Sequence, residues 1–194
     1  MKAVTVLSAH TAKTMWKHKN ALKVLCIEGF SNENGNTKAL LDEFLREYKN
    51  AEIIKYNTYK ESPKPCYGCG FCKENEKCVY SDLQNFFILF ETADIIIVAS
   101  PIYNLSFPAP LKALIDRLQP YYESYYKYGK IQKIKKRREA YFLAAAGCDG
   151  EKAFNIMRRQ LKNAFSITNI EYKGDKLLAN TDNIKESTKG ENDG

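Results

Sequence analysis

Four cysteines lie close together in one short stretch of the sequence. Cys66, Cys69, Cys72 and Cys78 follow the spacing C-x₂-C-x₂-C-x₅-C. The close spacing of the first three gathers three sulfur atoms around one compact centre, which suits a cubane iron–sulfur cluster whose irons each take one thiolate. Structural zinc usually takes its cysteines from two pairs that are further apart. The spacing favours a [4Fe–4S] cluster and leaves open a zinc site or a loop of free thiols.

A second candidate site is the segment Gly29 to Thr37, which is rich in Gly, Asn, Ser and Thr. The helix expected after it begins with backbone N–H groups that have no partner in the helix, and the helix dipole adds partial positive charge there. Small residues let a phosphate approach these groups, and the hydroxyls of Ser31 and Thr37 add donors. The segment is neither a P-loop nor a dinucleotide-binding fingerprint. The alternative is a plain turn with a helix N-cap.

A third candidate follows the most apolar run of the chain. Ser100, Pro101, Ile102, Tyr103 and Asn104 come directly after it. Proline stiffens this turn, the tyrosine offers an aromatic face, and backbone amides are available to the polar edge of a flat heterocycle. The alternative is a tyrosine that packs on its own helix.

These segments must be positioned by an alternation of apolar runs and segments with helical periodicity. We expect five strands, at 22–27, 51–56, 94–100, 140–146 and 167–172, and helices at 37–48, 81–91, 108–126 and 153–165. Ser81 and Asp82 are expected to cap the second helix, and Pro120 to kink or end the third. Such alternation predicts an α/β fold with a parallel sheet and helices on both faces. Ligands bind such sheets beyond the carboxyl ends of the strands, so the loops after strands one, three and four are the expected site.

The remaining segments define the expected boundaries. Residues 21–178 form one domain with a cysteine-rich loop at 57–80, residues 1–20 form an N-terminal arm, and the polar stretch 179–194 reads as a disordered tail. The arm is either a loosely ordered terminus or a segment that packs on another subunit.

Composition narrows the function classes without choosing one. The 194 residues carry a formal net charge of +7, which favours anionic partners such as a phosphorylated cofactor or an acidic protein. Neither a membrane span nor a signal peptide is evident, so we expect a cytoplasmic protein with reduced thiols. Cys26 lies within an apolar run and is expected in the core. The basic stretch Lys130 to Arg138 is either a solvated connector or a docking surface for an acidic electron carrier.

Two of these motifs carry a family resemblance. Ala99 to Tyr103, followed by Leu111 to Arg117, resembles the signature of the NADPH-dependent FMN reductase group of flavodoxin-like proteins. The first loop resembles the phosphate loop of that group, commonly Gly-Ser-Pro-Arg-x-x-Gly-Asn-Thr. It keeps Gly29 and the Gly-Asn-Thr at 35–37, and it departs at Phe30 and at residues 31–32. The cysteine motif resembles that of the iron–sulfur flavoprotein branch. The resemblance covers residues 22–178.

The resemblance implies a flavodoxin-like three-layer sandwich with strand order 2-1-3-4-5 and a bound FMN. By that resemblance the FMN phosphate lies on Ser31, Gly35, Asn36 and Thr37, and the isoalloxazine ring lies against the loop of residues 100–104. The loop with Gly147 and Cys148 closes the pyrimidine side, and Cys66, Cys69, Cys72 and Cys78 hold the cluster. The flavin supplies the redox chemistry, so no catalytic side chain is expected.

The resulting expectation is an FMN-dependent oxidoreductase in which a [4Fe–4S] cluster passes electrons to FMN. A carrier such as ferredoxin, or NAD(P)H, is the expected donor, and the group implies a homodimer or homotetramer. The alternatives are a cluster-free NAD(P)H-dependent FMN or quinone reductase, a non-catalytic flavin-fold carrier, and a zinc-loop module that binds RNA. We expect neither a nucleic-acid nor a membrane partner.

Overall fold

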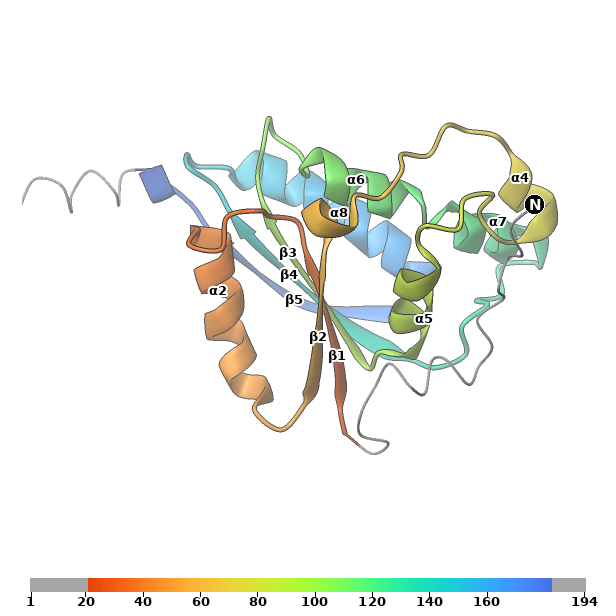
Figure 1. Ribbon diagram of the computed structural model, residues 1–194, viewed down its shortest axis with the longest axis horizontal. Helices are drawn as coiled ribbons and strands as arrows, with labels where there is room; N and C mark the ends of the chain where they lie inside the picture. Colours follow the sequence, from red (N-terminus) through yellow and green to blue (C-terminus); the bar gives the residue numbers. More distant parts are fainter. Residues whose placement is uncertain (1–20, 183–194) are drawn as a thin grey trace, which may run out of the picture.

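A computed structural model describes residues 21–182. The predicted arm at 1–20 and the last part of the predicted tail, 183–194, lie outside the described residues. Five parallel strands form one sheet in the order β2-β1-β3-β4-β5, which confirms the predicted fold class and strand order (Figure 1). The strands are β1 Lys23–Glu28, β2 Glu52–Asn57, β3 Ile95–Pro101, β4 Arg138–Ala145 and β5 Ile170–Leu178.

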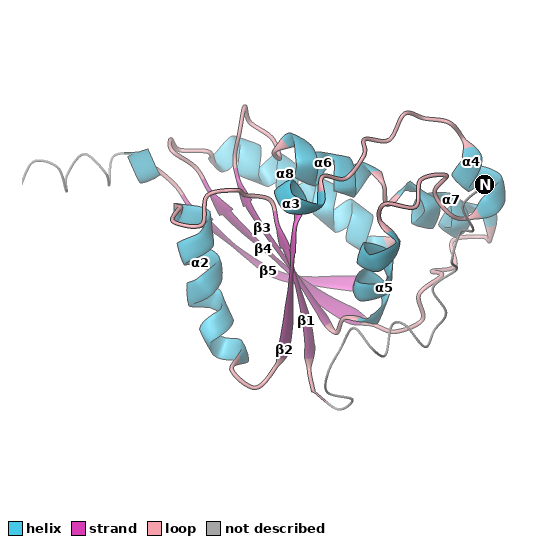
Figure 2. Ribbon diagram, in the orientation of Figure 1, coloured by secondary structure: helices cyan, strands magenta, loops and turns pink. Residues whose placement is uncertain are grey.

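Helices cover both faces of this sheet (Figure 2). One face is packed by α2, and the other by α5, α6 and α8. Three short elements and α7 lie along the connections. The bounds are α2 Asn36–Leu45, the 3₁₀ turn η1 Arg46–Tyr48, α3 Thr58–Glu61, α4 Phe71–Asn75, α5 Gln84–Thr92, α6 Ala109–Asp116, α7 Gln119–Lys127 and α8 Glu151–Ser166.

The two central strands explain why the sequence folds this way. Every residue of β3 is buried, as are five of the six in β1. Their side chains alternate between two apolar clusters, one beneath α2 and a larger one beneath α5, α6 and α8. A strand covered on both faces reads as a continuous apolar run, which is why the runs were visible in the sequence.

The helix predicted over 108–126 is instead two helices. α6 ends at Asp116 and α7 begins at Gln119, with Arg117 and Leu118 between them. Pro120 has no N–H to donate to a carbonyl one turn earlier, so it sits in the first turn of a new helix, where no such bond is needed.

Two other boundaries differ from the prediction. α5 begins at Gln84 rather than at the Ser81-Asp82 pair, because the Asp82 carboxylate accepts hydrogen bonds from Lys64 N and Arg117 instead of capping the helix. β5 begins at Ile170 rather than residue 167, because Asn169 turns the chain with a φ of +56°. The last described residues, 179–182, hydrogen-bond to the loop after β4 through the amides of residues 180–182.

A substitution at Gly29 would test how tightly the end of β1 packs against α6. A Cβ added to Gly29 would lie 2.5 Å from Leu111 Cδ2 of α6. We expect Gly29→Ala to lower the free energy of unfolding by about 1–3 kcal/mol through overpacking, measured by urea denaturation. Gly174→Ala is the control, since its Cβ would meet nothing nearer than 3.6 Å. Equal free energies of unfolding for both variants and the parent would contradict this prediction, because α6 would then move to accept the added methyl group at no cost.

Candidate functional site

The three loops predicted to form the site meet at the carboxyl edge of the sheet. The amide of Gly29, after β1, donates to Ala99 O of β3 at 2.8 Å. The amide of Ile102, after β3, donates to Ala145 O at the end of β4, also at 2.8 Å. Hydrogen bonds between neighbouring strands thus continue into the loops and hold all three side by side.

The loop between β1 and α2 presents backbone amides and small side chains. Asn32 shapes its turn, since its side chain accepts from Asn34 N and its carbonyl accepts from Gly35 N. Gly35 is the N-cap of α2, and no capping side chain from residues 21–182 bonds to this helix start. Ser31 is exposed and Thr37 is buried in the first turn. An uncapped helix start with adjacent hydroxyls is an anion-binding arrangement.

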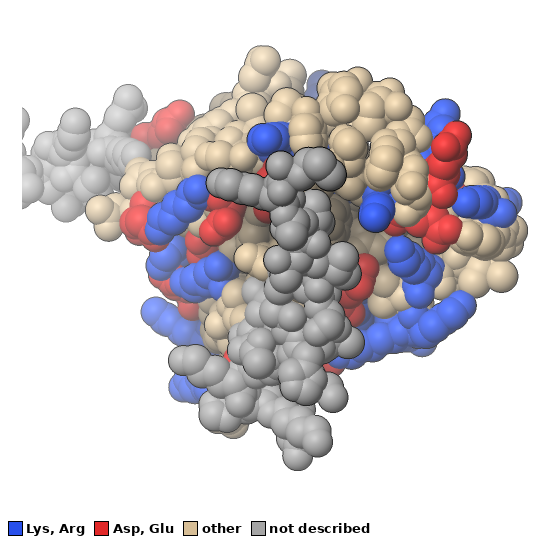
Figure 3. Space-filling view, turned by 45° about the vertical axis from the view of Figure 1, so that its right-hand side comes forward, with Lys and Arg blue, Asp and Glu red and all other residues tan. Residues whose placement is uncertain are grey.

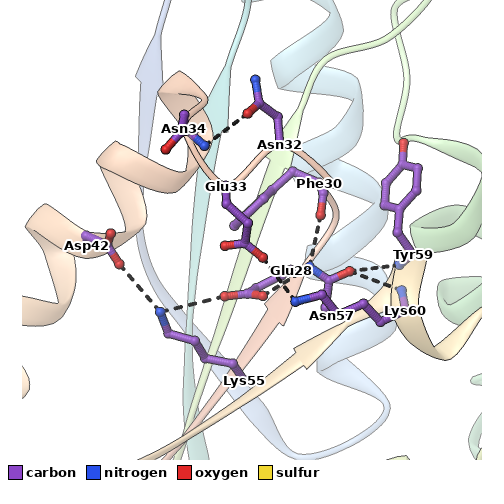
Figure 4. Close-up of polar contacts among 10 residues, drawn as sticks. All are labelled: Glu28, Phe30, Asn32, Glu33, Asn34, Asp42, Lys55, Asn57, Tyr59 and Lys60. Carbon is purple, nitrogen blue, oxygen red and sulfur yellow. Dashed lines mark hydrogen bonds and ion pairs between the residues drawn. The ribbon is translucent and has the colours of Figure 1, made fainter.

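A buried polar pair anchors the base of this loop (Figure 4). Asn57, the last residue of β2, donates from Nδ2 to Phe30 O at 3.0 Å and to Glu28 Oε2 at 3.2 Å. Its Oδ1 accepts from the amides of Tyr59 and Lys60, so the same side chain caps α3. Phe30 itself is buried against α2, so packing fixes the loop at this position.

The cations near this loop are already paired. Lys55 lies 3.8 Å from Glu28 Oε1 and 3.5 Å from Asp42, and Lys60 lies 3.1 Å from Glu33 (Figure 4). Glu28 is only 4% exposed: its Oε2 accepts from Asn57, and its Oε1 faces Lys55 without a hydrogen-bond partner among the described residues. Positive charge for an anion here therefore comes mainly from the amides of the helix start.

The loop after β3 forms a tight two-residue hairpin. Tyr103 and Ser106 exchange backbone hydrogen bonds of 3.0 and 2.9 Å, and Asn104 and Leu105 between them have φ values of +48° and +60°. A positive φ at Leu105 is strained, and such strain concentrates at functional sites. Ser100 is buried and Tyr103 is 54% exposed, so the tyrosine ring is presented to solvent rather than packed into the core.

The loop after β4 is covered by the end of the described chain. Cys148 is exposed, and the Asp182 carboxylate occupies the space where a side chain at Gly147 would lie. Thr181 is buried and bonds to Ala146 O through both its amide and its hydroxyl. Gly150 has a φ of +63° at the N-cap of α8, which brings this loop toward Ile102.

The four clustered cysteines all line one cavity of about 190 Å³, between their loop and the junction of α6 and α7. Cys66 and Cys69 are exposed, and Cys72 and Cys78 are partly buried. Across residues 21–182, no group of three or more His, Cys, Asp or Glu side chains is drawn together closely enough to hold a metal ion. All four thiols that a four-thiolate centre needs therefore line one cavity, but their sulfur atoms lie too far apart in this structure to bind one metal ion.

A partly buried thiol and a guanidinium line this cavity. Burial is the largest influence on Cys72, and it raises the pKa of that thiol. Burial alone would lower the pKa of Arg117, but its hydrogen bond to Asp82 and the nearby Cys78 outweigh it and raise the pKa. Arg117 is thus a permanent cation beside the cysteines.

With this geometry in place, comparisons with known proteins decide the family. The family model for NADPH-dependent FMN reductase matches residues 22–174. The chain belongs to the NADPH-dependent FMN reductase family. No helix in the described part of this family member is long and apolar enough to cross a membrane.

Similar proteins of two named kinds bear on the function of this FMN reductase family member. The chain is 35% identical over 103 residues to an iron–sulfur flavoprotein of Archaeoglobus fulgidus, covering 52% of this chain and 47% of that protein. It is 27% identical over 163 residues to an FMN-dependent NADH:quinone oxidoreductase of Clostridium beijerinckii, covering 76% and 82%. The chain spans about half the length of the iron–sulfur flavoproteins it matches.

Solved structures agree on the fold. An NAD(P)H:quinone oxidoreductase from Methanothermobacter marburgensis superposes with a TM-score of 0.65 at 17% identity, covering 81% of this chain and 83% of that one. An FMN-dependent NADH-azoreductase from Bacillus anthracis, solved with FMN, gives 0.60 at 18% identity, covering 87% and 95%.

Sequence reasoning missed the polar residues beneath the loops. Glu28 and Asn57 each stand at the end of an apolar strand, which was a signal that they face the site edge rather than the core. Asp182 and the Asp82–Arg117 pair had no comparable signal, because their partners are far away in the sequence.

The thiol of Cys26 should be inert. Burial, followed by the nearby Glu28, raises its pKa to about 12. The reactive thiolate is therefore almost absent at neutral pH, and alkylation becomes appreciable only as the pH approaches that value or the protein unfolds. We expect iodoacetamide at pH 8 to modify the exposed Cys148 and spare Cys26, as read by peptide mass spectrometry. Labelling of Cys26 in the folded chain at the rate of Cys148 would contradict this.

Proposed function

We propose that this chain is an FMN-dependent oxidoreductase whose flavin binds at the carboxyl edge of the sheet. The observation that carries the proposal is the junction of three loops around the uncapped start of α2, at the place where α/β sheets bind ligands. Membership of the FMN reductase family supports it and favours it over the zinc-loop RNA-binding alternative.

Each loop has a distinct task in this proposal. Ser31, Thr37 and the amides of Gly35 and Asn36 bind the phosphate, since they supply hydroxyl and N–H donors at the positive end of a helix. The loop with Pro101, Ile102, Tyr103 and Asn104, following Ser100, supports the ring. Gly147 and Cys148 border its other edge, where Asp182 and Thr181 hold their loop in place.

Bound FMN would supply hydride and electron transfer, and the protein supplies position and electrostatics. The exposed Tyr103 places an aromatic ring at the solvent side of the proposed site, where a donor or acceptor would approach. NAD(P)H fits as donor, because the relatives named NADH:quinone oxidoreductases use a nicotinamide donor by name.

The finer proposal adds a [4Fe–4S] cluster held by Cys66, Cys69, Cys72 and Cys78. Four thiols on one cavity are the donor set that such a cluster takes, and the relatives named iron–sulfur flavoproteins support the assignment. Bound there, the cluster would add single-electron transfer. The cluster-free quinone reductase is the competing version, supported by the relatives named FMN-dependent NADH:quinone oxidoreductases.

Two surfaces suggest partners for this function. Five Lys or Arg side chains and no acid lie between Lys130 and Arg137, which suits an acidic carrier such as ferredoxin. Two of these pair with acids, Lys136 with Asp94 and Arg137 with Glu171. Lys and Arg alternate with Asp and Glu over much of the surface in Figure 3, so the net positive charge is not one uniform field.

Tyr122 and Tyr126 are exposed on α7 and suit contact with a second copy in a homodimer or homotetramer.

The phosphate loop is tested by comparing FMN with riboflavin. We expect Thr37→Val to weaken FMN binding about 10- to 100-fold, the equivalent of about 1.5–3 kcal/mol for a lost hydrogen bond to a charged group. Riboflavin has no phosphate, so its binding should not change. Fluorescence quenching of each flavin measures both, and Thr37→Ser, which keeps the hydroxyl, is the control. Equal losses for FMN and riboflavin would place the phosphate elsewhere.

The cysteine assignment is tested by metal content. After anaerobic purification we expect about four iron atoms and one flavin per chain, with a broad absorbance beyond the flavin bands. Cys66→Ser should lose the iron and that absorbance while keeping FMN. A parent protein that binds FMN without iron would establish the cluster-free version.

A further inference from the structure

The two ends of the cysteine loop meet at one buried guanidinium. Arg117 Nη1 donates to Lys64 O, just before Cys66, at 2.8 Å. Its Nη2 lies 3.5 Å from Tyr80 O, just after Cys78. One side chain, directly after α6, therefore contacts the backbone two residues before the first cysteine and two residues after the last.

Asp82 completes this contact from the opposite side. Its Oδ1 accepts from Arg117 Nη2 at 2.7 Å, and its Oδ2 accepts from Lys64 N at 2.9 Å. Lys64 is thus held by its amide and its carbonyl at once. We call Arg117 and Asp82, with the backbone of Lys64 and Tyr80, the neck clamp.

Burial makes this arrangement costly to break. Arg117 is 1% exposed, and a buried charge stripped of its partner is strongly destabilising. Its planar fork matches carbonyl and carboxylate geometry at several donors, which a lysine cannot reproduce. The Tyr80 ring lies 5.0 Å from the guanidinium carbon and covers it further.

Between its fixed ends, the loop is built differently. Gly68 and Gly70 have φ values of +73° and +74°, and a Cβ at either would meet no described atom within 4 Å. The cysteines around them line the cavity without being gathered into a metal-binding group of described residues. The ends are therefore defined by buried charge, while the interior has open space in which the sulfur atoms can approach one another.

Arg117 also has one N–H group that makes no hydrogen bond to a described residue. It lines the cysteine cavity, and among the described residues its buried Nε–H has no hydrogen-bond partner. A buried donor without a partner is destabilising unless something satisfies it. Outer-shell hydrogen bonds to ligand atoms are a common way to orient a metal centre.

We propose that the neck clamp positions Cys66 and Cys78 for a four-thiolate centre, and that the Arg117 Nε–H donates to a cysteine sulfur once the centre is loaded. Arg117 and Asp82 are positioning residues in this inference, which rests on the proposed four-cysteine site and is independent of FMN binding.

Cobalt(II) is the probe, because thiolate-bound tetrahedral Co²⁺ has a visible spectrum that reports its ligands. Anaerobic titration of the reduced full chain should give the four-thiolate spectrum. We expect Asp82→Asn and Arg117→Lys to weaken Co²⁺ binding about 10- to 100-fold, the usual effect of losing an outer-shell partner. Lys112→Gln is the matched control, since it breaks the exposed Lys112–Asp116 ion pair on the same helix and should bind Co²⁺ as the parent does.

Thermal melting of each metal-free variant separates positioning from folding. Arg117 is buried, so Asp82→Asn, whose side chain is 21% exposed, is the deciding variant. A folded Asp82→Asn chain with the parent's Co²⁺ affinity and spectrum would overturn the inference. A parent chain that binds Co²⁺ no better than Cys66→Ser would overturn both the inference and the cluster assignment, while FMN titration of the same sample judges the flavin site separately.

Discussion

The molecule depends on the pairing of β1 between β2 and β3. Both neighbours run parallel to β1 and in continuous register, so the three carboxyl ends lie at one edge. Because β1 and β3 are buried on both faces, a slip in register would carry apolar side chains out of two clusters at once. The loop contacts follow from this constraint: the bond from Gly29 N to Ala99 O is the next step of the same ladder.

Buried polar side chains then fix the paths of the loops, which strand pairing does not determine. Asn57 ties the first loop to β2, and Arg117 ties the two ends of the cysteine loop to α6. Arg138, the first residue of β4, ties two further segments together at the amino edge of the sheet, where its guanidinium donates to Phe90 O and Thr168 O. Desolvation lowers the pKa of Arg138 to about 10, still high enough to keep it charged at neutral pH. Each of these side chains donates to at least one backbone carbonyl, so each constrains the path of a loop.

The sequence was most informative where local pattern and burial coincide. The apolar runs located all five strands, and the strand order followed from the resemblance carried by two loops. The predicted start of α5 was wrong because a side chain has a distant partner: Asp82 resembles a helix cap in the sequence but bonds to Arg117, 35 residues away. Local sequence patterns cannot predict side-chain pairs between residues that are far apart in the chain. The same holds for Asp182, whose contact with Gly147 is visible only once the chain is folded.

Helix α6 connects the two candidate sites mechanically. It starts just after the Tyr103 hairpin and ends at Asp116, and the next residue, Arg117, lines the cysteine cavity. Eight residues of α-helix extend only about 12 Å, and a single rigid element therefore fixes how the flavin-side loops and the cysteines sit relative to each other. Leu111 in its middle packs against Gly29, so the close approach that only glycine permits at the first loop also sets the position of the helix. The spacing of the two sites is thus a property of the core, and a change at Gly29 would be felt at Arg117 through α6.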